Sequence, residues 1–170
     1  MFHLTADVLR DLLHYDPETG IFTRIKIVAP QSRVKVGDVA GARNHDGYWR
    51  VKVGGRSGRT YQAHRLAWLY MTGEWPIGEI DHKDLDPSNN RWLNLREADR
   101  STNIANTRRR SDNTSGMKGV YWSPSHGRWR SEITVHKRRI FLGSFHTAEL
   151  ARAAYVDAAI NHYGEFARIA

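Results

Sequence analysis

Four polar side chains in the middle of the chain are of types that can bind a cation or accept a proton. They are Asp81, His82, Asn94 and Asn103, with Asn94 twelve residues after the histidine and Asn103 twenty-one after it. A carboxylate and an amide supply hard oxygen ligands, which suit Mg²⁺ or Mn²⁺ better than Zn²⁺. An imidazole has an unperturbed pKa of about 6.5, so it can accept a proton near neutral pH. If these side chains converge, they form an oxygen-rich metal site with a base beside it.

The residues around them predict a strand, a loop and a helix. Residues 79–82 are expected to end a short strand, and residues 84–90 are dense in turn formers. Asp99 has the short acceptor side chain of an N-cap, which indicates a helix over residues 100–106. Asn103 would then lie in the first turns of that helix, where it can face the strand end.

Two other interpretations of this stretch stay open. Residues 84–90 alternate oxygen-bearing side chains, as the start of a calcium-binding EF-hand loop does. However, Asn89 stands where that loop requires glycine, and Leu95 stands where it requires a bidentate glutamate. In the second alternative the stretch is a turn-rich loop whose acid and amides satisfy backbone groups, and His82 is incidental.

The stretch resembles the HNH nucleases of the ββα-metal type, especially their phage and intron-encoded branch. The resemblance is carried by Asp81-His82, Asp84, Ser88-Asn89-Asn90-Arg91, Asn94-Leu95-Arg96, and Ser101 with Asn103. It implies that Asp81 and Asn103 hold one divalent ion, Mg²⁺ or Mn²⁺, in each active site. It also implies that His82 takes a proton from the attacking water and that Asn94 holds the His82 ring. A Lewis acid would stabilise the charge that develops on the phosphoryl and leaving oxygens.

Composition limits the class of partner. The 170 residues carry a formal net charge of +8, which favours a polyanion, since clustered Lys and Arg gain affinity by releasing phosphate counterions. We expect double-stranded DNA. The absence of cysteine excludes disulfides and thiolate-bound zinc. Nothing resembles a signal peptide and no apolar run reaches membrane-spanning length, so we expect a cytoplasmic protein. The resemblance to the phage and intron-encoded nucleases implies a phage-infected or element-bearing bacterial host.

The N-terminal part predicts a small mixed unit in front of the motif. Apolar spacing and turn residues predict helix 5–14 with Thr5 as its cap, turn 15–20, strand 21–27, strands 48–53 and 60–63, and helix 64–71. This pattern also resembles the amino-terminal part of many phage HNH proteins. His64 opens the last of these helices and has two interpretations: it assists at the phosphate, or it is a structural histidine at a helix start.

The composition changes after Asn106. Residues 107–116 contain no hydrophobic residue and begin with the basic cluster Arg108, Arg109 and Arg110. Three arginines in isolation are typical of a solvated charge run. Between two modules we expect them to contact DNA phosphates or a minor groove, on a basic linker.

Residues 117–170 predict a second compact unit. Strands are expected over 119–122, 128–135 and 139–143, joined as an antiparallel meander. A helix is expected over 148–162, capped by Thr147, and its alanines should let it lie close against the sheet. Between Arg108 and Phe141 nine Lys and Arg residues stand against two acidic ones. One face of the sheet should therefore be strongly positive.

This unit resembles the plant ethylene-response-factor type of DNA-binding domain, which also occurs attached to phage and mobile-element HNH nucleases. The resemblance is carried by Lys118-Gly119-Val120, Gly127-Arg128-Trp129, Glu132-Ile133, residues 141–145, Thr147-Ala148-Glu149, Ala151, Ala154-Tyr155, Asp157 and Ala158-Ala159. It implies that the sheet lies in the major groove. The residues expected to bind DNA are Lys118, Tyr121, Trp122, Arg128, Arg130, Thr134, Arg139 and Phe141. Several differ from the plant domains, so no target sequence carries over, and one of Trp122 and Trp129 could instead fill a small core.

These patterns predict an α+β protein: a ββα-metal nuclease domain over residues 1–106, the basic linker over 107–116, and over 117–170 a small three-stranded antiparallel sheet packed on one helix. The expected function is a metal-dependent, site-specific DNA endonuclease of homing type, monomeric or weakly dimeric, that leaves 5′-phosphate and 3′-hydroxyl ends. Two alternatives stay open. One is a non-catalytic DNA-binding regulator with a decayed nuclease domain, and the other is a structure-specific nuclease acting on branched or packaged phage DNA.

Overall fold

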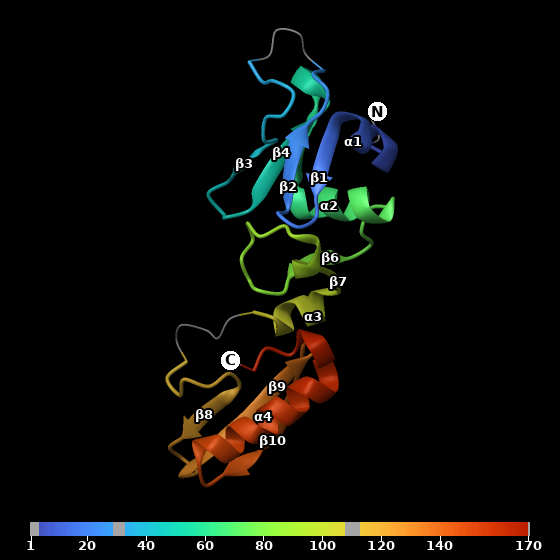
Figure 1. The fold of residues 1–170 in the computed structure, drawn as a ribbon. Coiled ribbons are helices and arrows are strands. Elements are labelled where there is room, and N and C mark those ends of the chain that lie inside the picture. The colour runs from blue at the N-terminus through green and yellow to red at the C-terminus, as the bar shows by residue number, and fades with distance from the viewer. Residues whose placement is uncertain (1–3, 29–32, 108–112, 170) are drawn as a thin grey trace. The chain divides into compact units, whose positions relative to one another are not determined.

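The chain folds as two compact units, Met1–Glu97 and Ala98–Ala170, and the computed structural model describes residues 4–28, 33–107 and 113–169 (Figure 1). The elements of the first unit are α1 (Ala6–Leu12), β1 (Leu13–Asp16), β2 (Ile21–Arg24), β3 (Ala42–Arg43), β4 (Trp49–Val53), η1 (Gly55–Ser57), β5 (Arg59–Gln62), α2 (Ala63–Thr72), β6 (Glu79–His82), η2 (Trp92–Asn94) and β7 (Leu95–Ala98), whose last residue belongs to the second unit. The second unit continues with α3 (Arg100–Ala105), β8 (Val120–Ser123), β9 (Arg128–Val135), β10 (Arg138–Phe145), α4 (Ala148–Tyr163) and η3 (Gly164–Phe166).

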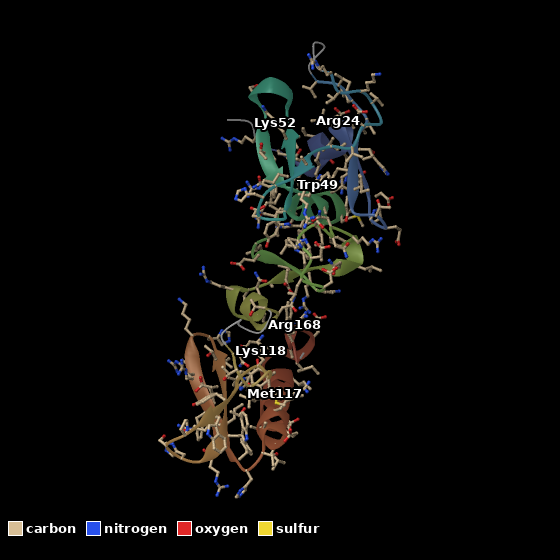
Figure 2. All side chains as sticks on the ribbon, turned by 90° about the vertical axis from the view of Figure 1, so that its left-hand side faces the viewer. Arg24, Trp49, Lys52, Met117, Lys118 and Arg168 are labelled. Carbon is tan, nitrogen blue, oxygen red and sulfur yellow. The ribbon has the colours of Figure 1, made fainter. Side chains whose placement is uncertain are left out.

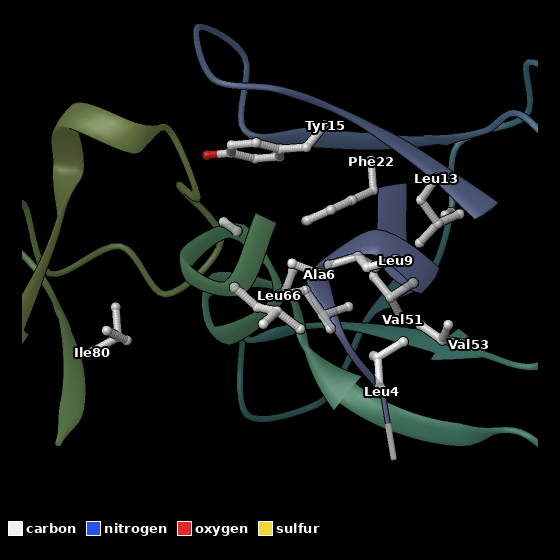
Figure 3. Packing of buried hydrophobic residues seen from close by; sticks show 14 of the residues in the cluster. Leu4, Ala6, Leu9, Leu13, Tyr15, Phe22, Val51, Val53, Leu66 and Ile80 are labelled. Atoms are coloured by element: carbon white, nitrogen blue, oxygen red, sulfur yellow. The ribbon is translucent and has the colours of Figure 1, made fainter. Parts of the chain in front are cut away.

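The first unit packs two helices against small antiparallel sheets. Strands β1 and β2 form a hairpin, strands β3, β4 and β5 form a three-stranded sheet, and β6 pairs with β7. Apolar side chains from these elements meet in one cluster, in which Leu9, Phe22, Val51 and Leu66 are almost completely buried (Figure 3). The cluster joins the N-terminal hairpin to the helix α2 that precedes β6.

The first helix is shorter than the sequence predicts. Thr5 caps it as expected, with its hydroxyl accepting a hydrogen bond from the backbone N–H of Val8. The helix ends at Leu12, however, and the chain passes directly into β1, where Leu13 and Tyr15 are buried and His14 between them is exposed. This alternation is that of a strand, and pairing with β2 stabilises it. The prediction of a helix to residue 14 was therefore wrong, as was the extension of the next strand beyond Arg24.

The second unit contains a three-stranded antiparallel sheet in the order β10-β9-β8, and α4 packs against all three strands. Its core is formed by Val120, Ile133, Ala151, Tyr155 and further small or aromatic side chains. The alanines of α4 allow close approach of the helix to the sheet, as the sequence predicts. The α+β fold class is confirmed.

A glycine is required where the first strand of this sheet begins. Gly119 has a φ of +72°, and a Cβ there would lie 2.2 Å from the Tyr155 ring and 2.6 Å from the carbonyl oxygen of Glu132. The backbone at Gly119 instead accepts a hydrogen bond from the N–H of Glu132. Any side chain would separate the sheet from α4.

The division by packing falls earlier in the sequence than the expected domain boundary at residue 106. The helix α3 contacts α4 and η3 and so belongs to the second unit. That residues 1–106 and 117–170 fold as separate modules stays a prediction. Over residues 4–28, 33–107 and 113–169, none of the helices is long and apolar enough to span a membrane.

Candidate active site

Asp81 and His82 lie at the end of β6 and are almost completely buried, with 4% and 5% of their surfaces exposed. Arg96, on the partner strand β7, approaches Asp81 with two donors. Its Nη2 and Nε atoms lie 2.8 and 2.9 Å from Asp81 Oδ2. This buried ion pair holds the Asp81 carboxylate in place at the end of β6, where His82 follows it in the chain.

The surroundings of His82 favour the neutral imidazole. Burial lowers the pKa of His82 below its ordinary value, and a hydrogen bond with Asn90 and the nearby charge of Asp84 oppose that shift only in part. The hydrogen bond joins His82 Nε2 and Asn90 Oδ1 over 3.3 Å. A neutral imidazole is the form that can accept a proton from water.

His64 and Tyr48 also contact this imidazole. The His64 ring is 5.0 Å from the His82 ring, edge to face, and Tyr48 lies 5.4 Å from His64 and 6.0 Å from His82. Burial, together with the charges of His82 and Arg65, lowers the pKa of His64 to about 3. His64 is thus a buried neutral side chain at the start of α2, and its ring contact with His82 places it beside the candidate base.

The side chain of Asn94 organises the loop between β6 and β7. Its Oδ1 accepts a hydrogen bond from the backbone N–H of Asp84, and its Nδ2 donates to Asp84 Oδ1 and to the carbonyl oxygen of Asn89. Asn89 in turn donates to Asp84 Oδ2. The amide that meets the His82 ring is that of Asn90, and the role of Asn94 in holding this ring stays a prediction.

The expected second metal ligand, Asn103, lies on α3 in the other unit. That Asn103 and Asp81 lie close enough to hold one metal ion stays a prediction. Within the described part of the chain no three His, Asp or Glu side chains gather as a metal cage. A carboxylate and an amide nevertheless fit Mg²⁺ or Mn²⁺, because Mg²⁺ is commonly held by one or two protein oxygens together with water and substrate phosphates.

The register of the second unit's sheet brings most of the expected DNA-binding side chains to one face. Tyr121 is opposite Arg130, and Thr134 is opposite Arg139. Residues opposite one another in a ladder share a face, as do alternate residues along a strand. The side chains that share this face, away from the Ile133 of the core, are Tyr121, Arg128, Arg130, Thr134, Arg139 and Phe141.

Contacts between these side chains give the face a defined shape. The Arg130 guanidinium lies 4.5 Å from the centre of the Phe141 ring. Glu132 lies between Arg139, 3.4 Å away, and the Tyr121 hydroxyl, which donates to it over 3.3 Å. The face is thus basic with one acid in its centre, whose charge is partly neutralised.

The other expected DNA contacts lie elsewhere. Trp122 is opposite Trp129 and is 47% exposed, so the register places it on the face that carries α4. Lys118 donates to the carbonyl oxygen of Thr107, and burial, with the charge of Arg168, lowers its pKa to about 8 (Figure 2). Arg108, Arg109 and Arg110 lie outside the described residues. DNA binding by all of these residues stays a prediction.

Sequence reasoning missed three contributors to the site. Asn90 was interpreted as a turn residue, Arg96 was noted only as part of a motif, and Tyr48 was placed in a strand. Nothing in the residues around Arg96 indicates its pairing with Asp81, because alternation along β7 places Arg96 on the face opposite the buried Leu95. Nothing in the sequence near Tyr48 or Asn90 indicates their contact with His82.

Comparisons with known proteins agree with this site. The sequence model of a family described as HNH endonuclease matches residues 61–105. Protein 3.8 of Escherichia phage T7 is 34% identical over 106 residues, which are 62% of this chain and 87% of that protein. The match therefore extends over most of the phage protein.

Two plant proteins match a shorter stretch. The ethylene-responsive transcription factor ERN1 of Medicago truncatula is 51% identical over 53 residues, and that of Lotus japonicus is 50% identical over 54 residues. These stretches are 30% and 31% of this chain but only 19% and 20% of the plant proteins. A solved structure, "DNA binding and cleavage by the HNH homing endonuclease I-HmuI", aligns with a TM-score of 0.43 and 28% identity, over 56% of this chain and 51% of that chain.

The buried acid and imidazole on β6, with the match that encloses them, define a phosphodiester-cleaving hydrolase. The chain belongs to the HNH endonuclease family. It is a DNA endonuclease, and both family resemblances seen in the sequence are confirmed.

Proposed function

We propose that the protein is a metal-dependent, site-specific DNA endonuclease of homing type that leaves 5′-phosphate and 3′-hydroxyl ends. The observation that carries this proposal is the buried pair Asp81 and His82, in which a neutral imidazole lies beside a carboxylate held by Arg96. His82 takes the proton from the attacking water. Arg96 keeps the Asp81 carboxylate in one orientation throughout.

Asp81 and Asn103 are the residues that would hold one Mg²⁺ or Mn²⁺ ion. When bound, such an ion supplies Lewis-acid stabilisation of the negative charge that develops at the phosphate and the leaving 3′ oxygen. The protein's own contribution is to orient the carboxylate through Arg96 and to keep the base neutral through burial.

The sheet of the second unit would supply site preference. Its basic face carries arginines and an aromatic side chain, the groups that contact phosphates and base edges. A DNA reader tethered to a nuclease raises the effective concentration of the nuclease at one locus. We infer that this unit binds double-stranded DNA and that the protein acts as a monomer or weak dimer.

The test is cleavage of a supercoiled plasmid that carries the protein's own flanking genomic DNA, with Mg²⁺, with Mn²⁺ and with a chelator. The wild type should convert the plasmid only when the metal is present, and His82→Ala should bind DNA normally but not cut. Binding without cutting under every divalent ion tried would instead favour a regulator with a decayed nuclease. Equal cutting of unrelated DNA would favour a structure-specific nuclease.

A further inference from the structure

The amide of Asn90 is held in one orientation beside the His82 ring. Asn90 is 2% exposed, and its Nδ2 donates to the carbonyl oxygen of Ser88 over 3.2 Å. A carbonyl oxygen can only accept, so the nitrogen of the amide must face Ser88 and the oxygen must face His82. The orientation of the Asn90 amide therefore follows from its hydrogen bonds.

This orientation selects one form of the imidazole. An amide oxygen only accepts, so the His82 Nε2 atom that lies 3.3 Å from it must carry a hydrogen. In the neutral ring the lone pair is then on Nδ1, which is the atom able to take a proton. We propose that Asn90 is a positioning residue that fixes the orientation of the His82 ring and holds it as the Nε2–H tautomer.

The backbone of Asn90 is held by the N-terminal hairpin. The Tyr15 hydroxyl, whose oxygen points out of the hydrophobic cluster (Figure 3), donates to the carbonyl oxygen of Asn90 over 2.6 Å. The backbone N–H of Trp92 donates to the carbonyl oxygen of Pro17 over 3.0 Å. The hairpin and the loop of the site are thus joined at Asn90 and again two residues after it, at Trp92.

The packing at this junction leaves no room for adjustment. Gly20, the last residue of the turn, has a φ of +74°, and a Cβ there would lie 2.4 Å from the backbone carbon of Asn90 and 2.5 Å from the nitrogen of Arg91. Tyr15 itself is 1% exposed and packs against the Phe22 ring at 4.8 Å. The hairpin, which lies outside residues 61–105 matched by the family, is therefore part of the support of the base.

The expected effect on the rate of cleavage rests on the proposed nuclease function. The orientation and the tautomer of the His82 ring do not. NMR on the ¹⁵N-labelled full chain, at an alkaline pH where the ring is neutral, shows which imidazole nitrogen carries the hydrogen. His82→Gln identifies the His82 signals by their loss. We expect a hydrogen on Nε2 that exchanges slowly with water. A hydrogen on Nδ1 would overturn the proposal, whether or not the protein cuts DNA.

The kinetic arm compares single-turnover cleavage at saturating DNA and metal. Asn90→Ala should slow cleavage by roughly 10- to 100-fold, the usual cost of removing a residue that orients a site side chain, with DNA affinity unchanged. Leu93→Ala is the matched control, because it shortens a side chain that is 77% exposed in the same connection between β6 and β7, and it should cut at the wild-type rate. An Asn90→Ala rate equal to that of the wild type refutes the positioning role.

Tyr15→Phe tests the hairpin without emptying its core position. It removes only the hydroxyl, so the Nε2 hydrogen should exchange faster and cleavage should slow by less than in Asn90→Ala. Unchanged exchange and unchanged cleavage would overturn the part assigned to the hairpin. A wild type that never cuts DNA refutes the proposed function, while the NMR measurement still decides the tautomer.

Discussion

Replacing Arg96 by methionine tests how much burial increases the contribution of the Asp81–Arg96 ion pair to the free energy of unfolding. Arg96→Met puts an unbranched apolar side chain in place of the arginine and removes the guanidinium that donates twice to Asp81 Oδ2. The Asp81 carboxylate stays buried without this partner, and burial of a charge without its partner is costly.

The structure supplies an ion pair of the same length for comparison. Arg96 and Asp81 are 2.8 Å apart with 10% and 4% of their side chains exposed, whereas Lys26 and Asp11 are also 2.8 Å apart with 57% and 61% exposed. Removing one partner of a buried pair costs about 3–5 kcal/mol, and an exposed pair contributes about 0–1 kcal/mol. Arg96→Met should therefore reduce the free energy of unfolding by several times more than Lys26→Met does.

Urea denaturation of both variants, without metal and then with Mg²⁺, measures the difference. Mg²⁺ should restore part of the stability of Arg96→Met, because a cation that binds only the folded state stabilises it. Adding Asp81→Asn to Arg96→Met should also recover stability, since the buried carboxylate that lost the guanidinium is then replaced by a neutral amide. Equal losses in Arg96→Met and Lys26→Met would refute the reasoning from burial.

Two further predictions concern pH and DNA binding. The pKa of His64 is about 3 in the folded chain and about 6.5 in the unfolded chain. The unfolded state therefore binds more protons as pH falls, and stability is lost below about pH 6.5. Between about pH 7 and pH 4, urea titrations should show the wild type losing about 3 kcal/mol more of its free energy of unfolding than His64→Gln loses. Equal losses would contradict the burial of a neutral imidazole. Arg130→Ala should weaken DNA binding by roughly 1 to 3 kcal/mol and relax sequence preference. Arg152→Ala, which removes the same charge from α4, should leave both unchanged. Equal effects of the two variants in a binding titration would rule out the sheet face as the DNA-binding surface.

The elements that sequence reasoning predicted well are those whose signals are local. Strand β6 and strand β9 begin and end where the sequence predicts, because turn residues bound β6 and a run rich in β-forming residues defines β9. The Thr5 and Thr147 caps were also predicted, since a cap depends on its own three or four residues.

The errors and omissions come from contacts between distant segments. Strand β1 was missed because its pairing with β2, and not its own propensity, decides its conformation. The contact of Asn90 with His82 could not be read from a run of turn formers, since it depends on how the loop packs against the hairpin. Arg96 was invisible for a similar reason: a charged residue in a short strand is usually exposed.

The bond between Tyr15 and Asn90 joins residues that are 75 positions apart. Closing so long a segment carries an entropic cost that local contacts do not pay, so the loop of the site is expected to take its final form late in folding. The imidazole is then aligned only after the hairpin, the core and the strand pair are in place. We therefore expect partly folded chains that already expose basic surface to bind DNA before they can cut it. Cleavage should begin only when folding is complete.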